Sequence, residues 1–172
     1  MPDATFEELS MPLFDQLYNF AHWLTQDKSE AEDLVQETYA KALRGFSGFQ
    51  AGTNFRAWIF RILRNTFLTS RTGLKVGGQS DQELDALASV DPSPEAILIG
   101  NADRGMVRQA LQELSVSFRE ILLLCEVEEM AYDEIAQVLA IPIGTVMSRL
   151  HRARKALRTL LIKKFKGGSH GL

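Results

Sequence analysis

Hydroxyl and basic side chains gather on one side of the segment 145–158 when it is drawn as a helix. They are Thr145, Ser148, Arg149, Arg152 and Lys155. Serine and arginine can reach base edges in the major groove of DNA, and the N-terminal end of a helix attracts phosphate. The pattern therefore indicates a helix that reads double-stranded DNA. A surface helix that happens to be basic is the alternative.

The residues around this helix have the order of a helix-turn-helix, with the sequence YDEIAQVLAIPIGTVMSRLHRARKAL from 132 to 157. Ile135 and Leu139 fall on one side of the first predicted helix, and Pro142 prevents the turn from continuing as helix. In the second helix, apolar residues repeat with helical spacing and are expected to be buried. This stripe comprises Val146, Leu150, Ala153, Leu157 and Leu160.

Catalytic chemistry is poorly supported by the remaining polar residues. A metal-dependent phosphohydrolase would need a cluster such as His22, Glu32, Asp33 and Glu37. Carboxylates one turn apart are common on capped helices, and no matching set of His and Asp occurs on a second helix. We therefore expect no enzyme activity, no metal and no cofactor.

Charge is segregated along the chain, although the formal net charge is only −3. Residues 1–40 carry nine acids and one base, and residues 80–135 carry thirteen acids and three bases. Residues 41–79 carry seven bases and residues 136–172 carry eight, with no acid in either block. Each basic block is a candidate surface for a polyanion. Docking of basic faces onto acidic ones, within the protein or in a dimer, is the alternative.

The apolar residues have helical spacing almost everywhere, which predicts an all-α protein. We expect two small helical domains, at 1–72 and 95–166, with the helix-turn-helix in the second. The segment 73–94, rich in glycine and proline, is expected to be a flexible linker, and 167–172 a flexible tail. The predicted helices span about 13–24, 29–43, 55–70, 95–114, 117–127, 132–139 and 145–164.

Three helix starts have recognisable capping chemistry. Ser29 with Glu32 and Ser117 with Glu120 have the spacing of capping boxes, in which the two side chains satisfy free backbone N–H groups. The segment 93–95 reads Ser-Pro-Glu. Proline is tolerated in the first turn and an acid there faces the positive end of the helix dipole, so a helix is expected to begin at this point.

No apolar run approaches the roughly 20 residues of a membrane span. The first residues, MPDATFEEL, lack the basic start and apolar stretch of a secretory signal. The single cysteine, Cys125, cannot form an intramolecular disulfide. These features predict a cytoplasmic protein that is not inserted in the membrane.

Taken together, three stretches resemble the extracytoplasmic function (ECF) group of the sigma-70 family of bacterial sigma factors. EAEDLVQETYAKALRGF at 30–46 is similar to the helix by which the family binds core RNA polymerase. FRAWIFRILRNTFLTSR at 55–71 is similar to the helix that reads the promoter's minus-ten element, and the segment 113–157 is similar to the domain that reads the minus-thirty-five element. The resemblance implies an alternative sigma factor that directs polymerase to specific promoters.

The resemblance also implies the residues of each contact. The polymerase contact would be Asp33, Leu34, Gln36 and Glu37, which match the family's Asp-Leu-x-Gln-Glu pattern. The family captures the minus-ten element as an unpaired strand, and the matching residues here are Thr53, Asn54, Phe55, Arg56, Trp58, Arg61, Arg64 and Asn65.

Some aromatic residues of the minus-ten segment must be core residues. Phe55 and Trp58 lie on the apolar side of their predicted helix, so packing and DNA contact are equally compatible with their position. Phe60 and Phe67 share the side that carries the arginines. A core formed by the side of the helix that carries Phe55 and Trp58 explains Phe60 and Phe67 less well.

The minus-thirty-five element would be read as duplex DNA. Thr145, Ser148, Arg149 and Arg152 are the expected base-reading residues, and Lys155 and Arg158 are expected on phosphate. The chain departs from the commonest family pattern at Met147, where a basic residue usually follows Gly-Thr-Val. One expected DNA contact is therefore missing.

The expected partners are core RNA polymerase, promoter DNA and an anti-sigma factor, which in the family often sits at the membrane. A stand-alone helix-turn-helix regulator is the alternative. It would have one DNA surface and no use for the basic block at 41–79.

Overall fold

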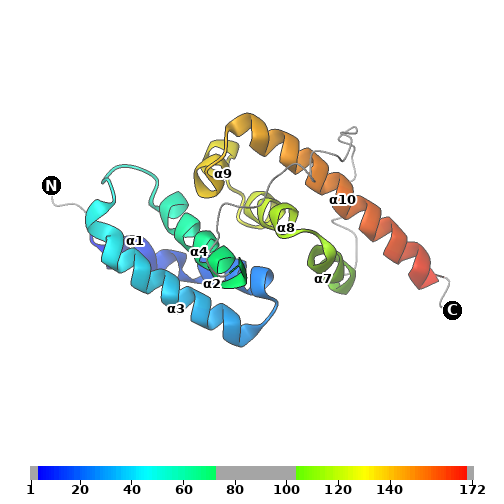
Figure 1. The fold of residues 1–172 in the computed structure, drawn as a ribbon, viewed down its shortest axis with the longest axis horizontal. Coiled ribbons are helices and arrows are strands. Elements are labelled where there is room, and N and C mark those ends of the chain that lie inside the picture. Colours follow the sequence, from blue (N-terminus) through cyan, green and yellow to red (C-terminus); the bar gives the residue numbers. More distant parts are fainter. Residues whose placement is uncertain (1–3, 73–103, 170–172) are drawn as a thin grey trace. The chain divides into compact units, whose positions relative to one another are not determined.

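The computed structural model describes residues 4–72 and 104–169, with side chains up to Lys166. These residues are helical apart from short turns and contain no strand, which confirms the all-α prediction (Figure 1). The expected linker at 73–94 and the expected helix start at 93–95 lie outside the described residues, as does the end of the tail at 170–172.

Residues 4–72 form three short and three longer helices. The short α1 (Phe6–Ser10) is capped by Thr5, whose side chain accepts a hydrogen bond from the Glu8 N–H, and it leads into the 3-10 helix η1 (Met11–Leu13). The sequence pattern had not indicated α1, because five residues are too few to show helical periodicity. The longer helices α2, α3 and α4 follow, with the 3-10 helix η2 between α3 and α4. Their bounds are α2 (Phe14–Thr25), α3 (Lys28–Gly45), η2 (Phe46–Gly48) and α4 (Phe55–Thr72).

These longer helices bury a shared apolar core. Figure 1 shows α2, α3 and α4 side by side, and each of them packs against the other two. The rings of Phe20 in α2 and Phe60 in α4 lie with their centroids 5.4 Å apart, and both are fully buried. Phe67 is buried as well. The expectation that the core explains Phe60 and Phe67 poorly was wrong, because the buried side of α4 is wide enough to include them.

The later part of the chain holds the helix-turn-helix. Its helices are α7 (Arg104–Glu113), α8 (Val116–Leu122), the π-helical turn η3 (Leu123–Val127), α9 (Tyr132–Leu139) and α10 (Ile143–Ser169). Ile135 and Leu139 of α9 are buried, as predicted. In the predicted stripe of α10, four members are buried and Leu160 is half-buried.

Two compact units contain these helices. The first combines Met1–Gln79 with Leu123–Ile143, and the second combines Ser80–Leu122 with Gly144–Leu172, as far as these ranges are described. In the first unit, α4 and α9 pack against each other. In the second unit, Lys164 of α10 forms an ion pair with Glu113 of α7.

Both predicted capping boxes are displaced in the structure. The N-cap of α3 is Asp27, whose carboxylate accepts a hydrogen bond from the Glu30 N–H at 2.9 Å. Ser115 rather than Ser117 caps α8, because its hydroxyl accepts from the Phe118 N–H at 3.2 Å. In each case the helix begins before the expected serine, and an oxygen-bearing side chain lies three residues before the N–H that it caps.

Candidate nucleic-acid interface

The loop before α4 is shaped by local hydrogen bonds. The Thr53 hydroxyl donates to the Gln50 carbonyl at 2.6 Å, and Gly52 has a φ of +89°, which side-chain-bearing residues rarely adopt. The Asn54 side-chain oxygen accepts from the Ala57 N–H at 3.0 Å, which starts α4. Asn54 is therefore a helix cap, while Thr53 and Asn54 are both exposed on the surface.

Phe46, Phe49, Phe55 and Trp58 form an aromatic cluster beside this loop, and the Phe6 ring of α1 also contacts it, with centroids 5.4 Å from Phe46. The Phe49 ring centroid lies 5.3 Å from that of Phe55 and 5.1 Å from that of Trp58, and Phe46 lies 6.2 Å from Phe55. Phe55 is buried, so its ring packs in the protein. Phe46, Phe49 and Trp58 are half-buried and leave part of their surface accessible for stacking on a base.

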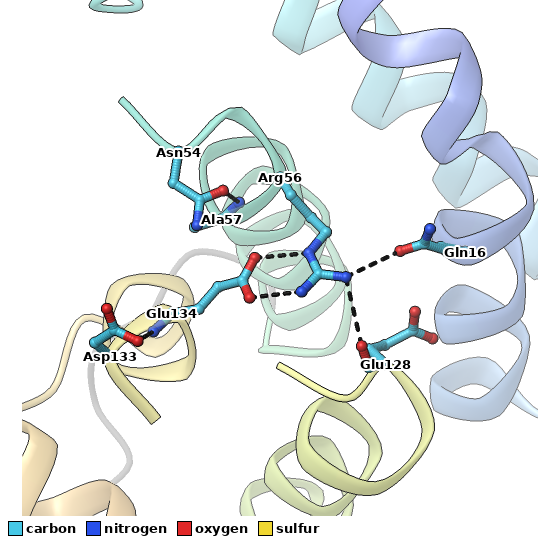
Figure 2. Close-up of polar contacts among 7 residues, drawn as sticks. All are labelled: Gln16, Asn54, Arg56, Ala57, Glu128, Asp133 and Glu134. Atoms are coloured by element: carbon cyan, nitrogen blue, oxygen red, sulfur yellow. Dashed lines mark hydrogen bonds and ion pairs between the residues drawn. The ribbon is translucent and has the colours of Figure 1, made fainter. Parts of the chain in front are cut away.

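Arg56, in the first turn of α4, is held by a set of oxygen acceptors (Figure 2). Its guanidinium donates to both carboxylate oxygens of Glu134, with Nε to Oε2 at 2.6 Å and Nη2 to Oε1 at 2.5 Å. Its Nη1 also lies 3.4 Å from the Gln16 side-chain oxygen and 3.4 Å from the Glu128 backbone oxygen. The predicted DNA-contacting arginine thus makes a bidentate ion pair inside the first unit.

The ionisation of the three charged groups reflects this arrangement. The hydrogen bond from Arg56 lowers the pKa of Glu134, and the hydrogen bond to Glu134 raises the pKa of Arg56. Burial raises the pKa of the Glu128 carboxyl group to about 7, and the nearby Arg56 charge offsets only part of that effect. Figure 2 agrees, because it shows the Glu128 carboxyl group directed away from Arg56.

The remaining polar residues of α4 differ in exposure. Arg61 is exposed, whereas Arg64 and Asn65 are half-buried. Arg71, which was not among the predicted contacts, pairs with Glu30 at 3.1 Å and lies 5.0 Å over the Phe67 ring. Arg61 and Arg71 are therefore the exposed arginines of α4, and the charge of Arg71 is paired with that of Glu30.

The predicted polymerase-contacting residues lie on α3. Asp33, Gln36 and Glu37 are exposed on one side of the helix. Leu34 is only 7% exposed and belongs to the core. The outer surface here is thus acidic and polar, with Glu37 lying 4.0 Å from Lys41.

The predicted reading residues of α10 are not equally accessible. Ser148 is exposed and donates to the Thr145 carbonyl at 3.3 Å. Thr145, Arg152, Lys155 and Arg158 are half-buried. Arg149 was expected on the exposed side but is only 3% exposed, so the structure contradicts that expectation.

Met147 is 53% exposed, next to Ser148 at the start of α10. The departure from the family pattern at this position therefore puts an apolar side chain on the surface.

Sequence reasoning missed Glu134, Glu128 and Gln16 as neighbours of Arg56. Glu134 is 78 residues from Arg56 in the chain, and no local pattern links two such distant positions. The only signal was the switch from acid-rich to acid-free blocks, which suggests pairing in general but names no partner.

Two further observations concern alternatives. Within 4–72 and 104–169, no group of three or more His, Cys, Asp or Glu side chains is placed to hold a metal ion. No helix in the described part of the chain is both long and apolar enough to cross a membrane.

Comparison with known proteins relates these features to a family. Residues 12–75 match the family model for sigma-70 region 2, and residues 104–157 match the one for sigma-70 region 4. The chain is 35% identical to the ECF RNA polymerase sigma factor SigE of Mycolicibacterium smegmatis, over 94% of this chain and 66% of that protein. It is 32% identical to the ECF RNA polymerase sigma factor EcfG of Rhodopseudomonas palustris, over 88% of each.

Solved structures show the same relationship. The sigma factor RpoE of Bartonella quintana, solved in complex with the anti-sigma factor NepR, superposes with a TM-score of 0.67 at 31% identity, covering 90% of this chain and 97% of that one. CnrH, solved in complex with the cytosolic domain of CnrY, has a TM-score of 0.66 at 25% identity, covering 92% of this chain and 88% of that one. The region 2 match contains α2, α3 and α4, and the region 4 match contains α9 and the first part of α10. The chain therefore belongs to the ECF group of the sigma-70 family, whose members are not enzymes but transcription initiation factors that bind core RNA polymerase and direct it to promoters.

Proposed function

We propose that the exposed side of α3 is the surface of this chain that binds core RNA polymerase. Asp33, Gln36 and Glu37 present acidic and polar groups to a partner, and Leu34 holds this side of the helix in place from the core. Charge complementarity sets register and encounter rate in such contacts. A basic partner surface is the match that this side of α3 requires.

The minus-ten element is read as an unpaired strand by the loop 49–54 and the start of α4. Thr53 and Asn54 are exposed for hydrogen bonding, and Trp58 has accessible ring surface for stacking. Phe55 supports the cluster from within. Arg56, Arg61, Arg64 and Asn65 supply the phosphate and base-edge contacts further along α4.

The minus-thirty-five element is read in the major groove by the start of α10. Thr145, Ser148 and Arg152 face bases, and Lys155 and Arg158 contact phosphate. Arg149, being buried, reaches DNA only after a side-chain rearrangement. The observation that carries the proposal is that one chain of the sigma-70 family presents an acidic and polar side on α3 and, on α10, an exposed Ser148 followed one turn later by Arg152.

The two reading modules occupy 1–72 and 95–166, with a linker at 73–94 and a tail at 167–172. The protein acts in the cytoplasm, and an anti-sigma factor restrains it. This last partner is inferred from the RpoE complex with NepR. A stand-alone regulator is not favoured, because the chain matches region 2 as well as region 4.

In vitro transcription with core RNA polymerase over a promoter library tests the proposal. The chain is expected to select a promoter class that core polymerase alone does not use. Asp33→Ala should weaken assembly with the polymerase, and Arg152→Ala should weaken use of the upstream element while assembly stays intact. A chain that neither binds core polymerase nor changes promoter choice would contradict the proposal.

A further inference from the structure

Glu134 occupies Arg56 in the way that a nucleic-acid phosphate would. The carboxylate accepts from two nitrogens of the same guanidinium group, Nε and Nη2. Arginine binds carboxylate and phosphate through the same planar, two-point geometry. While this ion pair is closed, the Nε–Nη2 edge of Arg56 is occupied by Glu134 and cannot bind a phosphate in the two-point geometry, and Nη1 lies 3.4 Å from the Gln16 side-chain oxygen and 3.4 Å from the Glu128 backbone oxygen.

The ion pair is also sheltered from water. The Arg56 side chain is 28% exposed and that of Glu134 is 11% exposed. An exposed ion pair is easily exchanged for solvent or salt, whereas a sheltered one is more costly to break because each charge must find a new partner. Glu134 belongs to α9, which packs against α4, so this helix pairing holds the Glu134 backbone beside Arg56.

We propose that the Arg56–Glu134 ion pair is an internal latch, in which the Glu134 carboxylate competes with single-stranded promoter DNA for Arg56 in the free protein. The inference rests on the proposed minus-ten role of Arg56. An incoming phosphate must displace Glu134 and also approaches a fixed negative charge. Glu134 thereby lowers the affinity of the free chain for DNA in two ways.

The size of the effect on DNA affinity depends on how often the Arg56–Glu134 ion pair is open in the free protein. When a binding-competent state is only a fraction of the molecules, the apparent affinity falls by that fraction. An ion pair that is open in about one free molecule in five lowers the apparent affinity about fivefold, so breaking the latch is expected to raise the affinity for single-stranded DNA by about that factor. In the assembled transcription complex, the polymerase holds the chain on the promoter, and the latch no longer limits binding.

The test uses the full-length chain and a fluorescein-labelled single-stranded DNA of mixed sequence, with binding followed by anisotropy at fixed salt. Glu134→Gln removes the negative charge and should lower the dissociation constant by about fivefold. Glu129→Gln is the matched control, since Glu129 is an exposed acid in the same unit and its loss changes the net charge equally. The control should change the affinity by less than about twofold.

Two more variants separate the latch from general charge effects. Glu134→Asp keeps the charge but shortens the side chain, so it should give a smaller gain than Glu134→Gln. The gain must also depend on Arg56. The double variant Arg56→Ala with Glu134→Gln should bind DNA no better than Arg56→Ala alone. Circular dichroism confirms that each variant keeps its helical content.

Equal affinities of the Glu134→Gln and Glu129→Gln variants would overturn the latch, and so would a gain that persists without Arg56. Promoter-directed transcription with core polymerase distinguishes this failure from failure of the proposed function. If Arg56→Ala lowers transcription but Glu134→Gln does not raise the affinity of the free chain, only the latch is wrong. If Arg56→Ala transcribes as well as the unmodified chain, the proposed role of Arg56 is wrong, and the latch with it.

Discussion

Tyr39 donates its hydroxyl to the backbone carbonyl of Ser10 at 2.8 Å, and thereby ties α3 to the end of α1 across 29 residues of chain. Burial of the ring raises the pKa of Tyr39, which keeps the phenol protonated as a donor. The same ring meets Phe6 edge to face, with centroids 6.2 Å apart. One side chain thus joins the short first helix to the side of the bundle where α3 lies.

Replacing Tyr39 with Phe should lower the free energy of unfolding by about 1 kcal/mol, because the Ser10 carbonyl loses its donor while the aromatic packing remains. Urea denaturation followed by circular dichroism measures the change. Tyr18→Phe is the control. Tyr18 is half-buried and stacks on His22, so its substitution should cost less than that of Tyr39. Equal losses for both would show that the Ser10 hydrogen bond is unimportant.

Asp27→Ala should destabilise the protein by about 1 kcal/mol, because α3 loses its N-cap acceptor. Ser29→Ala should have almost no effect, since Ser29 lies inside the first turn and is exposed. Thermal unfolding of the two variants side by side distinguishes them. A greater loss of stability in Ser29→Ala than in Asp27→Ala would indicate that Ser29, as predicted from the sequence, is the residue that caps α3.

The adjacent residues Phe60 and Arg61 should separate stability from function. Phe60 is fully buried, so Phe60→Ala should cost about 3–5 kcal/mol through lost burial and the cavity that remains. Arg61 is exposed, so Arg61→Ala should leave the unfolding free energy within about 0.5 kcal/mol and reduce transcription from the selected promoter. Chemical denaturation and in vitro transcription provide the two readouts. A large loss of stability in Arg61→Ala would contradict its placement on the surface.

Stability should fall as the pH rises through the titration range of Glu128. Burial raises the pKa of this carboxyl group from 4.5 to about 7, so between these values the folded state holds a proton that the unfolded state has released. Stability therefore decreases with pH across this window, and the full loss is reached above the folded pKa. Glu128→Gln removes the titrating group.

Melting temperatures of the unmodified protein and of Glu128→Gln should differ more at about pH 8 than at about pH 5, with the variant favoured at the higher pH. Glu129→Gln is again the control, since that side chain is exposed. Glu134 acts in a separate range. The pKa of Glu134 is lowered in the folded protein, so its contribution to folding stability is present above the pKa of the unfolded state. That contribution is lost as the pH falls through the pKa of the folded state. A melting difference for Glu128→Gln that does not vary with pH would contradict the assignment.

Ser148→Ala and Met147→Ala test the start of α10. Loss of a single base contact costs about 1–3 kcal/mol, so Ser148→Ala should reduce use of the minus-thirty-five element by roughly tenfold. Met147→Ala should shift the preference at one base position and leave polymerase binding unchanged. Transcription from promoters that carry single-base changes in the upstream element gives both results. Thr159→Ala, at an exposed residue later in α10, is the control.

Local pattern was enough to predict most of the fold. The 3-and-4 spacing of residues such as Val146 and Leu150 depends only on the geometry of one helix, and both are buried as expected. Helix existence follows from such short-range periodicity. Helix starts follow less well, because several oxygen-bearing side chains lie close together before α3, and the sequence does not show which of them will accept the first N–H.

The sequence by itself determined that this protein is all-helical, that its positive charge lies in two separate blocks, and that a hydroxyl-bearing helix follows a turn at Pro142. Tertiary structure alone decided which of the polar residues remain accessible. It buried Arg149, placed Phe60 in the core and joined Arg56 to Glu134 across 78 residues. The physical reason is that helical periodicity is set by neighbours within a turn, whereas burial and ion pairing depend on how separate helices pack, and residues near one another in the chain do not encode that packing.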